Sequence, residues 1–370
     1  MKRMLLLLLA LVCSPAVALE ITDVGTVEGC KLILNPGVQE LHERLVIPET
    51  ISEVVGAPEG ELSVLRFSGP DINLECVGTL VKNHPLLKFQ GFSVIGDHDG
   101  SPTGSGAAGY SGFGIRKVDK VIFEDVEVSY VPGLGITSGG VIDLTVKDCR
   151  VHDVGRDGCT HYGRQQSVLV GETWVGSGWA DGRTLKSVKI SGCRIWNVGD
   201  DSIAFWLSSA GYYCYHEYIE NVLIEDNLII SVNSHNPKNF SRGVALGGVK
   251  RAIIRNNTIV NAPTNGIWVG YDTAAMHKHN LPARDCEDVL IMGNRIVDVG
   301  RYQGVGYAKS QIAISARNVN GYFIDKNVID GVYLNKEDPA ITGTGLDLSG
   351  AANGTLGSNT IKNTGRTFRQ

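Results

Sequence analysis

One short pattern recurs along most of this chain: an aliphatic residue, two polar residues, a marker residue, any residue and a second aliphatic residue. It occupies 122–131, 146–154, 190–198, 224–232, 254–262, 291–299 and 324–332. The marker positions are Val126, Cys149, Cys193, Asn227, Asn257, Asn294 and Asn327, with Asn359 in a weaker last copy. Each copy is followed by a second short strand-like segment, at 135–138, 158–162, 202–206, 243–247, 266–270, 311–315 and 345–349. Because internal repeats indicate stacked units, the pattern predicts a solenoid of short strands.

A single repeat has too few strands to bury its own apolar face. Stacked rungs solve this problem, because each strand pairs with its counterpart in the next rung and the aliphatic residues form one continuous interior. The fold class is therefore all-β, a parallel β-helix. Asparagines stacked at one turn can hydrogen-bond along the axis, so we interpret the Asn column as structural. Cys149 and Cys193 in the same column form either a disulfide or two stacked free thiols.

The chain divides into three predicted parts. Residues 1–18 read as a signal peptide, 19–95 as an N-terminal cap with the first irregular coils, and 96–370 as the β-helix domain. Segment 38–45 (VQELHERL) resembles a short helix that would close the end of the solenoid, and a disulfide between Cys30 and Cys76 would staple this region.

The first residues predict export. Two basic residues precede an apolar run from Met4 to Val12, and Ala16-Val17-Ala18 has the form of a cleavage site, so we expect a secreted or periplasmic protein without a membrane span. The formal charge is −5, and removing two cations with residues 1–18 gives −7. No basic run suggests nucleic acid as a partner. Seven of the eight cysteines follow residue 18 without zinc-like spacing, and the oligomeric state stays open.

A polar column marks the start of the second strands. The residues two places before the buried aliphatic residue are Leu134, Asp157, Asp201, Arg242, Asn265, Ser310 and Thr344. Since neighbouring rungs lie roughly 4.8 Å apart, Asp157, Asp200 and Asp201 are predicted to form an acidic cluster with Arg242 beside it. Asp and Gly before a strand are also ordinary turn residues, which is the structural alternative.

Aromatic residues and insertions lie beside this column. The longest insertions are 163–186, 207–220, 233–241, 271–286 and 301–309, and their clustering predicts a groove. Tyr162, Trp206 and Trp268 offer flat faces for sugar rings, and His161 and Asn265 are further candidates for substrate binding.

The repeat resembles right-handed parallel β-helix proteins of the pectate lyase and polygalacturonase superfamily over roughly residues 90–365. Polygalacturonases carry Asn-Thr-Asp, Gly-Asp-Asp, Gly-His-Gly and Arg-Ile-Lys on successive rungs, and this chain has GRDG, GDDSIA, SRGVALG and NGIWVG in that order. The resemblance implies that Asp200 is a general acid and that Asp157 and Asp201 activate water, without a cofactor. Arg242, Trp268 and Gly270 replace the family's histidine, arginine and lysine, which puts pectin as a substrate in doubt.

Two alternatives remain. In a polysaccharide lyase acting on a uronate-containing glycan, Asp157, Asp200 and Asp201 would bind Ca²⁺ and Arg242 would remove the proton. In a non-catalytic glycan-binding or surface β-helix, the same residues would only bind or stabilise. The leading hypothesis is an exported enzyme that cleaves a polysaccharide or oligosaccharide by hydrolysis.

Overall fold

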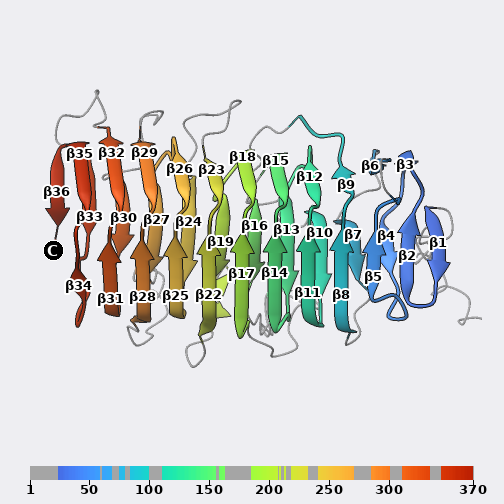
Figure 1. Ribbon diagram of the computed structural model, residues 1–370, viewed down its shortest axis with the longest axis horizontal. Coiled ribbons are helices and arrows are strands. Elements are labelled where there is room, and N and C mark those ends of the chain that lie inside the picture. The colour runs from blue at the N-terminus through green and yellow to red at the C-terminus, as the bar shows by residue number, and fades with distance from the viewer. Residues whose placement is uncertain are drawn as a thin grey trace, which may run out of the picture.

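The computed structural model describes residues 24–58, 61–68, 75–79, 84–99, 111–155, 158–162, 185–206, 208–209, 212–213, 218–231, 241–270, 285–300, 311–333 and 343–369. Every regular element in these ranges is a β-strand, and almost all of the strands belong to three long sheets (Figure 1). A separate antiparallel pair consists of β20 (Ser208–Ser209) and β21 (Tyr212–Tyr213).

The three sheets are named A, B and C. Sheet A contains β1 (Gly25–Glu28), β2 (Lys31–Leu34), β5 (Glu53–Val55), β8 (His84–Gln90), β11 (Val118–Glu124), β14 (Asp143–Lys147), β17 (Ser187–Ser191), β22 (Ile219–Glu225), β25 (Val249–Arg255), β28 (Cys286–Met292), β31 (Val319–Asp325) and β34 (Thr355–Leu356). Sheet B contains β3 (Gly37–Leu41), β6 (Ser63–Phe67), β9 (Ser93–Ile95), β12 (Glu127–Ser129), β15 (Arg150–Val154), β18 (Arg194–Val198), β23 (Leu228–Ile230), β26 (Thr258–Val260), β29 (Arg295–Val299), β32 (Val328–Val332) and β35 (Thr360–Thr364). Sheet C contains β4 (Leu45–Ile47), β7 (Glu75–Thr79), β10 (Ser111–Arg116), β13 (Leu134–Gly139), β16 (Cys159–Tyr162), β19 (Ile203–Trp206), β24 (Arg242–Gly247), β27 (Asn265–Gly270), β30 (Ile312–Ala316), β33 (Thr344–Asp347) and β36 (Arg366–Arg369).

Each rung contributes one strand to each sheet, and counterparts in successive rungs pair in parallel, as β22, β25 and β28 do. Within the described ranges the three sheets have one antiparallel pairing, between β1 and β2, which closes one end of sheet A. The predicted parallel β-helix is therefore confirmed.

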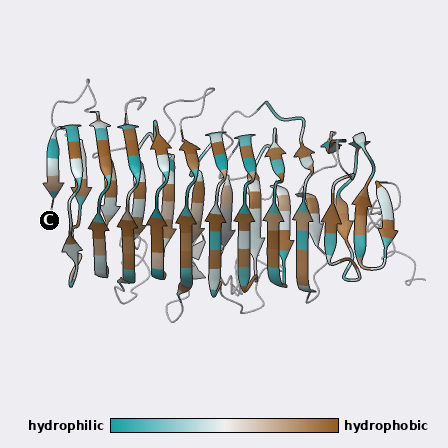
Figure 2. Cartoon of the chain, in the orientation of Figure 1, coloured by the Kyte–Doolittle hydropathy of each residue, from teal (hydrophilic) through white to brown (hydrophobic). Residues whose placement is uncertain are grey.

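The interior is a column of aliphatic and aromatic side chains enclosed by the three sheets. Strict alternation along each strand turns one residue in two inward, as Ile254, Ile259 and Ile267 show, one from each sheet and each with no exposed surface. Apolar residues mark the strands of all three sheets in Figure 2. Burying one such side chain contributes about 1.5–3 kcal/mol, so the stack of rungs supplies the main stabilising term.

The asparagine ladder is also confirmed. The Asn227 amide donates to Asn257 Oδ1 at 2.9 Å, and the Asn257 amide donates to Asn294 Oδ1 at 3.0 Å. Asn327 and Asn359 continue the ladder at 2.9 Å per step. Each step also supplies a backbone acceptor, as Asn257 Nδ2 donates to the Ile224 carbonyl at 2.9 Å. The column thus satisfies buried polar groups at the corner between sheets A and B.

Two predictions for the N-terminal part are wrong. Residues 38–45 are not a helix: they contain most of β3 and the start of β4, with Leu41 and Leu45 buried in the shared core. Eight residues with apolar positions fit a corner between two strands as well as a helical turn. Cys30 is exposed at the β1–β2 turn, whereas Cys76 is buried in sheet C, and no disulfide joins them, so they form no staple.

Candidate active site at the corner between sheets B and C

Glycine sets the geometry of the corner where the chain passes from sheet B to sheet C. A Cβ atom built on Gly135 would lie 2.4 Å from Val151 Cγ1, and one on Gly266 would lie 2.6 Å from Ile296 Cγ2. The position directly before the inward aliphatic residue therefore also faces the interior, and it must be small. The residue before this small position points away from the aliphatic interior, because Arg242 in this place contacts the half-buried Trp268. Asp201, Arg242 and the other members of the predicted polar column occupy this outer position.

Asp201 and Arg242 form a buried, bidentate ion pair across neighbouring rungs. Arg242 Nε donates to Asp201 Oδ1 at 2.8 Å, Arg242 Nη2 donates to Oδ2 at 2.9 Å, and the Arg242 backbone N–H donates to Oδ1 at 2.9 Å. The Asp201 residue is 3% exposed. Two parallel side-chain hydrogen bonds and one backbone hydrogen bond fix the relative orientation of the carboxylate and the guanidinium.

Trp268 lies beside this ion pair on the next rung. The Arg242 guanidinium carbon is 5.3 Å from the centre of the Trp268 ring, which is cation–π distance. Trp268 is half-buried on β27, and Asn265 on the same strand is the register partner of Arg242 and is buried. The structure thus brings four predicted residues, Asp201, Arg242, Asn265 and Trp268, onto three adjacent rungs.

Asp200 precedes Asp201 at the same corner and is half-buried. The register also makes Tyr162 and Trp206 partners on β16 and β19 and pairs His161 with Phe205, but the side chains of His161, Tyr162 and Trp206 lie outside the described part of the structure. Asp157 lies outside the described residues altogether. The proposed three-carboxylate cluster therefore stays a prediction.

One member of the predicted column is wrong. Asn265 pairs with Ile312, and Ile312 pairs with Thr344, so Ile312 and not Ser310 occupies the column in that rung. The segment QIAIS contains two isoleucines two residues apart, Ile312 and Ile314, and both phases give the same alternation. The register shows that Ile314 is the counterpart of Ile267.

Sequence reasoning missed a second ion pair on sheet C. Arg317 Nε donates to Asp347 Oδ2 at 2.8 Å, and Ser349 Oγ donates to Asp347 Oδ1 at 2.6 Å. The pKa of the fully buried Asp347 is lowered overall. Burial is the largest single influence and acts to raise it, but the hydrogen bonds from Ser349 and Arg317 together outweigh burial. A rung-by-rung alignment of the sequence places Asp347 in the same column as Trp268 and Ser315. A carboxylate in that column was the sequence signal that could have indicated the ion pair.

A histidine cluster on the outer face of sheet B was also missed. His152 lies 2.6 Å from Asp153 Oδ2 and 3.3 Å from Glu127 Oε1, and its ring stacks on Trp196 with centroids 4.0 Å apart. Burial, the largest influence, lowers the pKa of His152, but the two carboxylates outweigh it and raise this pKa overall. The cluster joins three rungs just before the corner that leads to Asp200.

Within the described ranges, no group of three or more His, Cys, Asp and Glu side chains could hold a metal ion. Because Asp157 is outside those ranges, the calcium site of the lyase alternative stays untested. The same ranges contain no helix that is long and apolar enough to span a membrane.

Comparison with known proteins agrees with this architecture. A family model described as right handed beta helix region matches residues 103–281, slightly less than half of the chain. No curated protein matches the sequence.

The similar solved structures include DFA-IIIase from Arthrobacter chlorophenolicus A6, at 14% identity and TM-score 0.57, covering 90% of this chain and 74% of that one. A C387A mutant of the same enzyme in complex with DFA-III aligns at 13% identity and TM-score 0.55, covering 90% and 74%. The A-module of mannuronan C-5 epimerase AlgE6 from Azotobacter vinelandii aligns at 14% identity and TM-score 0.51, covering 92% and 87%. The chain therefore has the right-handed parallel β-helix fold.

Proposed function

We propose that this protein is a carbohydrate-processing enzyme that cleaves a polysaccharide or oligosaccharide by hydrolysis at the corner between sheets B and C. The observation that supports the proposal most is the buried Asp201–Arg242 ion pair, with Asp200 preceding it and Trp268 beside it. A desolvated charge pair is costly to bury, and among the described residues this one, unlike Arg317–Asp347, lies beside a second carboxylate and an aromatic ring. The solved neighbours named above are carbohydrate-processing enzymes, which is consistent with this substrate class.

The residues suggest a division of roles. Asp201 accepts three hydrogen bonds from Arg242, so both of its carboxylate oxygens are engaged, and we assign it a positioning role. Asp200 is the candidate general acid for the leaving-group oxygen, and Asp157 is the candidate base that activates water. In this scheme Asp201 and Arg242 act through electrostatics and position.

Trp268 supplies the candidate sugar platform. Its ring lies on the strand after the ion pair, and aromatic faces make favourable apolar contact with sugar rings. The Arg242 guanidinium lies over this ring and is hydrogen-bonded to Asp201. A shift of the Trp268 ring would therefore displace Arg242 and, through it, Asp201.

The ion pair also bears on the lyase alternative. A base must lose its proton, whereas the bidentate contact with Asp201 stabilises the charged guanidinium. We therefore favour hydrolysis. A non-catalytic glycan-binding protein would need Trp268 but would not need Asp200. Substitution of Asp200 therefore distinguishes the hydrolase from the non-catalytic glycan-binding protein.

The test is a screen of acidic and neutral polysaccharides for two kinds of product. Hydrolysis gives new reducing ends only, whereas a lyase also gives unsaturated uronides that absorb in the ultraviolet and stops when a chelator removes Ca²⁺. Asp200→Asn is expected to lower the cleavage rate by at least about a hundredfold, the scale of general acid catalysis. Asp148→Asn, at an exposed carboxylate in the turn between β14 and β15, at the corner between sheets A and B, is the matched control. Unchanged cleavage by Asp200→Asn would refute the assignment.

A further inference from the structure

Cys149 and Cys193 occupy adjacent positions of the marker column, where the later rungs have asparagine. The residues that follow them, Arg150 and Arg194, are register partners in β15 and β18, and the Arg194 backbone N–H donates to the Cys149 carbonyl at 2.9 Å. Neighbouring strands lie about 4.8 Å apart, and this separation is within the roughly 4.4–6.8 Å between Cα atoms that a disulfide spans. Both cysteines are buried at 1% exposure, and in this structure both are free thiols, the reduced state.

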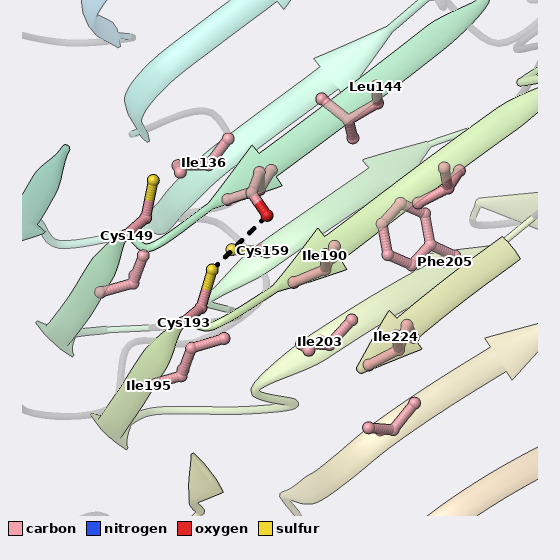
Figure 3. Packing of buried hydrophobic residues seen from close by; sticks show 14 of the residues in the cluster. Ile136, Leu144, Cys149, Cys159, Ile190, Cys193, Ile195, Ile203, Phe205 and Ile224 are labelled. Atoms are coloured by element: carbon pink, nitrogen blue, oxygen red, sulfur yellow. Dashed lines mark hydrogen bonds between the residues drawn. The ribbon is translucent and has the colours of Figure 1, made fainter. Parts of the chain in front are cut away.

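Both side chains point into the core from neighbouring rungs. Cys193 Sγ donates to the Val146 carbonyl at 3.6 Å, which takes this thiol back to the rung of Cys149. The equivalent amide of Asn227 donates to Ile190 in the same way, so the Cys193 thiol replaces an asparagine donor. Cys149 Sγ donates to the Lys147 carbonyl at 3.3 Å, one residue further along. Figure 3 shows both thiols, with Cys159 near them, in the apolar core.

We propose that Cys149 and Cys193 form a cross-rung disulfide in the oxidised protein, as a covalent continuation of the asparagine ladder. A thiolate of one cysteine attacks a small-molecule disulfide such as oxidised glutathione, forming a mixed disulfide and releasing one thiol. The second cysteine then attacks the protein sulfur of that mixed disulfide and releases the other thiol. Two protein thiols are oxidised, one external disulfide is reduced, and the two protons end on the released thiols.

Oxidation takes place during folding, before the core is closed. Burial, together with the neighbouring Cys193 thiol, raises the pKa of Cys149 well above its ordinary value, so the folded protein contains almost no reactive thiolate there. An exported protein, as the signal sequence predicts, folds where such oxidants are present.

The bond would fix the register of the rungs on which the candidate site is built. The two cysteines are 44 positions apart, and the chain between them includes β15, β16 and Asp157, while β18 leads directly to Asp200. A link at this place constrains a long loop in the unfolded chain and therefore favours the folded state. The inference does not depend on the proposed function, because it concerns the core and not the outer corner.

The direct test is a disulfide map of the wild-type protein. The protein is first reduced and then refolded with reduced and oxidised glutathione. It is next unfolded, its free thiols are alkylated, and the peptides are analysed by digestion and mass spectrometry. We expect two fewer alkylated cysteines than in the reduced sample and a linked peptide pair containing Cys149 and Cys193. Alkylation of both residues without a reductant, or a bond from either one to Cys159, would overturn the proposal.

A stability measurement tests its physical consequence. The midpoint of urea unfolding is expected to be higher for the oxidised wild type than for the reduced protein. Cys193→Ala should abolish this difference, whereas Cys286→Ala, at another fully buried cysteine, should retain it. If Cys193→Ala fails to fold, the peptide map of the wild type still decides. An equal midpoint for oxidised and reduced wild type would contradict the proposed role.

Discussion

Replacing Asn257 by alanine tests whether the asparagine ladder stabilises the solenoid. The Asn257 side chain accepts hydrogen bonds from Asn227 N at 3.1 Å and Asn227 Nδ2 at 2.9 Å, and it donates to the Ile224 carbonyl and to Asn294 Oδ1. After Asn257→Ala, Asn294 still receives the backbone N–H of residue 257, and the Asn227 amide still reaches Ile190. One buried backbone group, the N–H of Asn227, loses its side-chain partner, and the Ile224 carbonyl, which lies within the β22–β25 pairing, loses the additional hydrogen bond from the Asn257 amide.

A buried, unsatisfied polar group costs about 1–3 kcal/mol, so Asn257→Ala should lower the free energy of unfolding by about 1–3 kcal/mol. The matched control is Asn359→Ala in the last rung. Asn359 makes the same type of bonds to Asn327 and Ile324, but it is only half-buried, so water can replace them. Its loss should be about 1 kcal/mol or less.

The assay is equilibrium unfolding in urea, followed by circular dichroism and tryptophan fluorescence. The midpoint should fall much further for Asn257→Ala than for Asn359→Ala, with the dependence on urea unchanged. Equal losses in the two variants would refute the reasoning, because the cost would then not come from desolvated partners.

Three further predictions follow from the corner and the histidine cluster. The pKa of His152 is raised in the folded protein, so its contribution to stability should be complete below about pH 6.5 and should decline as pH rises through the folded pKa. The pKa of Glu127 is lowered, so its contribution should be lost in acid. In thermal unfolding scans, a His152→Gln variant should not show the decline at higher pH. Gly135→Ala places a methyl group against the core and should lower the free energy of unfolding in urea by about 1–3 kcal/mol. An unchanged urea midpoint would show that the corner is not tightly packed. Arg242→Leu leaves the Asp201 charge buried and should cost about 3–5 kcal/mol, and adding Asp201→Asn should restore most of it; without such recovery in the double variant, the ion pair is not the cause.

Much of the fold could be predicted because the same physical requirement recurs in every rung. The marker column fixes the phase of Asn227, Asn257 and Asn294, and their ladder follows from that phase alone. The segment at 38–45 lacks a marker of this kind, so its apolar spacing fitted a helix as well as a corner. Ile312 and Ile314 likewise alternate equally in either phase, and only pairing with β27 distinguishes them.

The candidate site was harder to predict, because contacts at a corner depend on direction as well as register. The predicted polar column placed Asp201 beside Arg242. The sequence could not show that the guanidinium donates hydrogen bonds to both carboxylate oxygens or that it lies over Trp268. The outward turn of this column depends on the small interior position that follows it, such as Gly266. His152 was overlooked as a site residue because its partners, Glu127 and Trp196, belong to other rungs.

The ladder runs in one sense: from Asn227 onward, the amide of every marker asparagine donates to the marker of the following rung and to a carbonyl of the preceding one. Any coil bounded by two such asparagines therefore presents the same donors above and the same acceptors below. Coils are thus interchangeable with respect to the ladder, and duplication or removal of the segment from Asn257 to the residue before Asn294 would leave the hydrogen bonds of the ladder matched. The length of the molecule can vary in steps of one turn without redesign of its core.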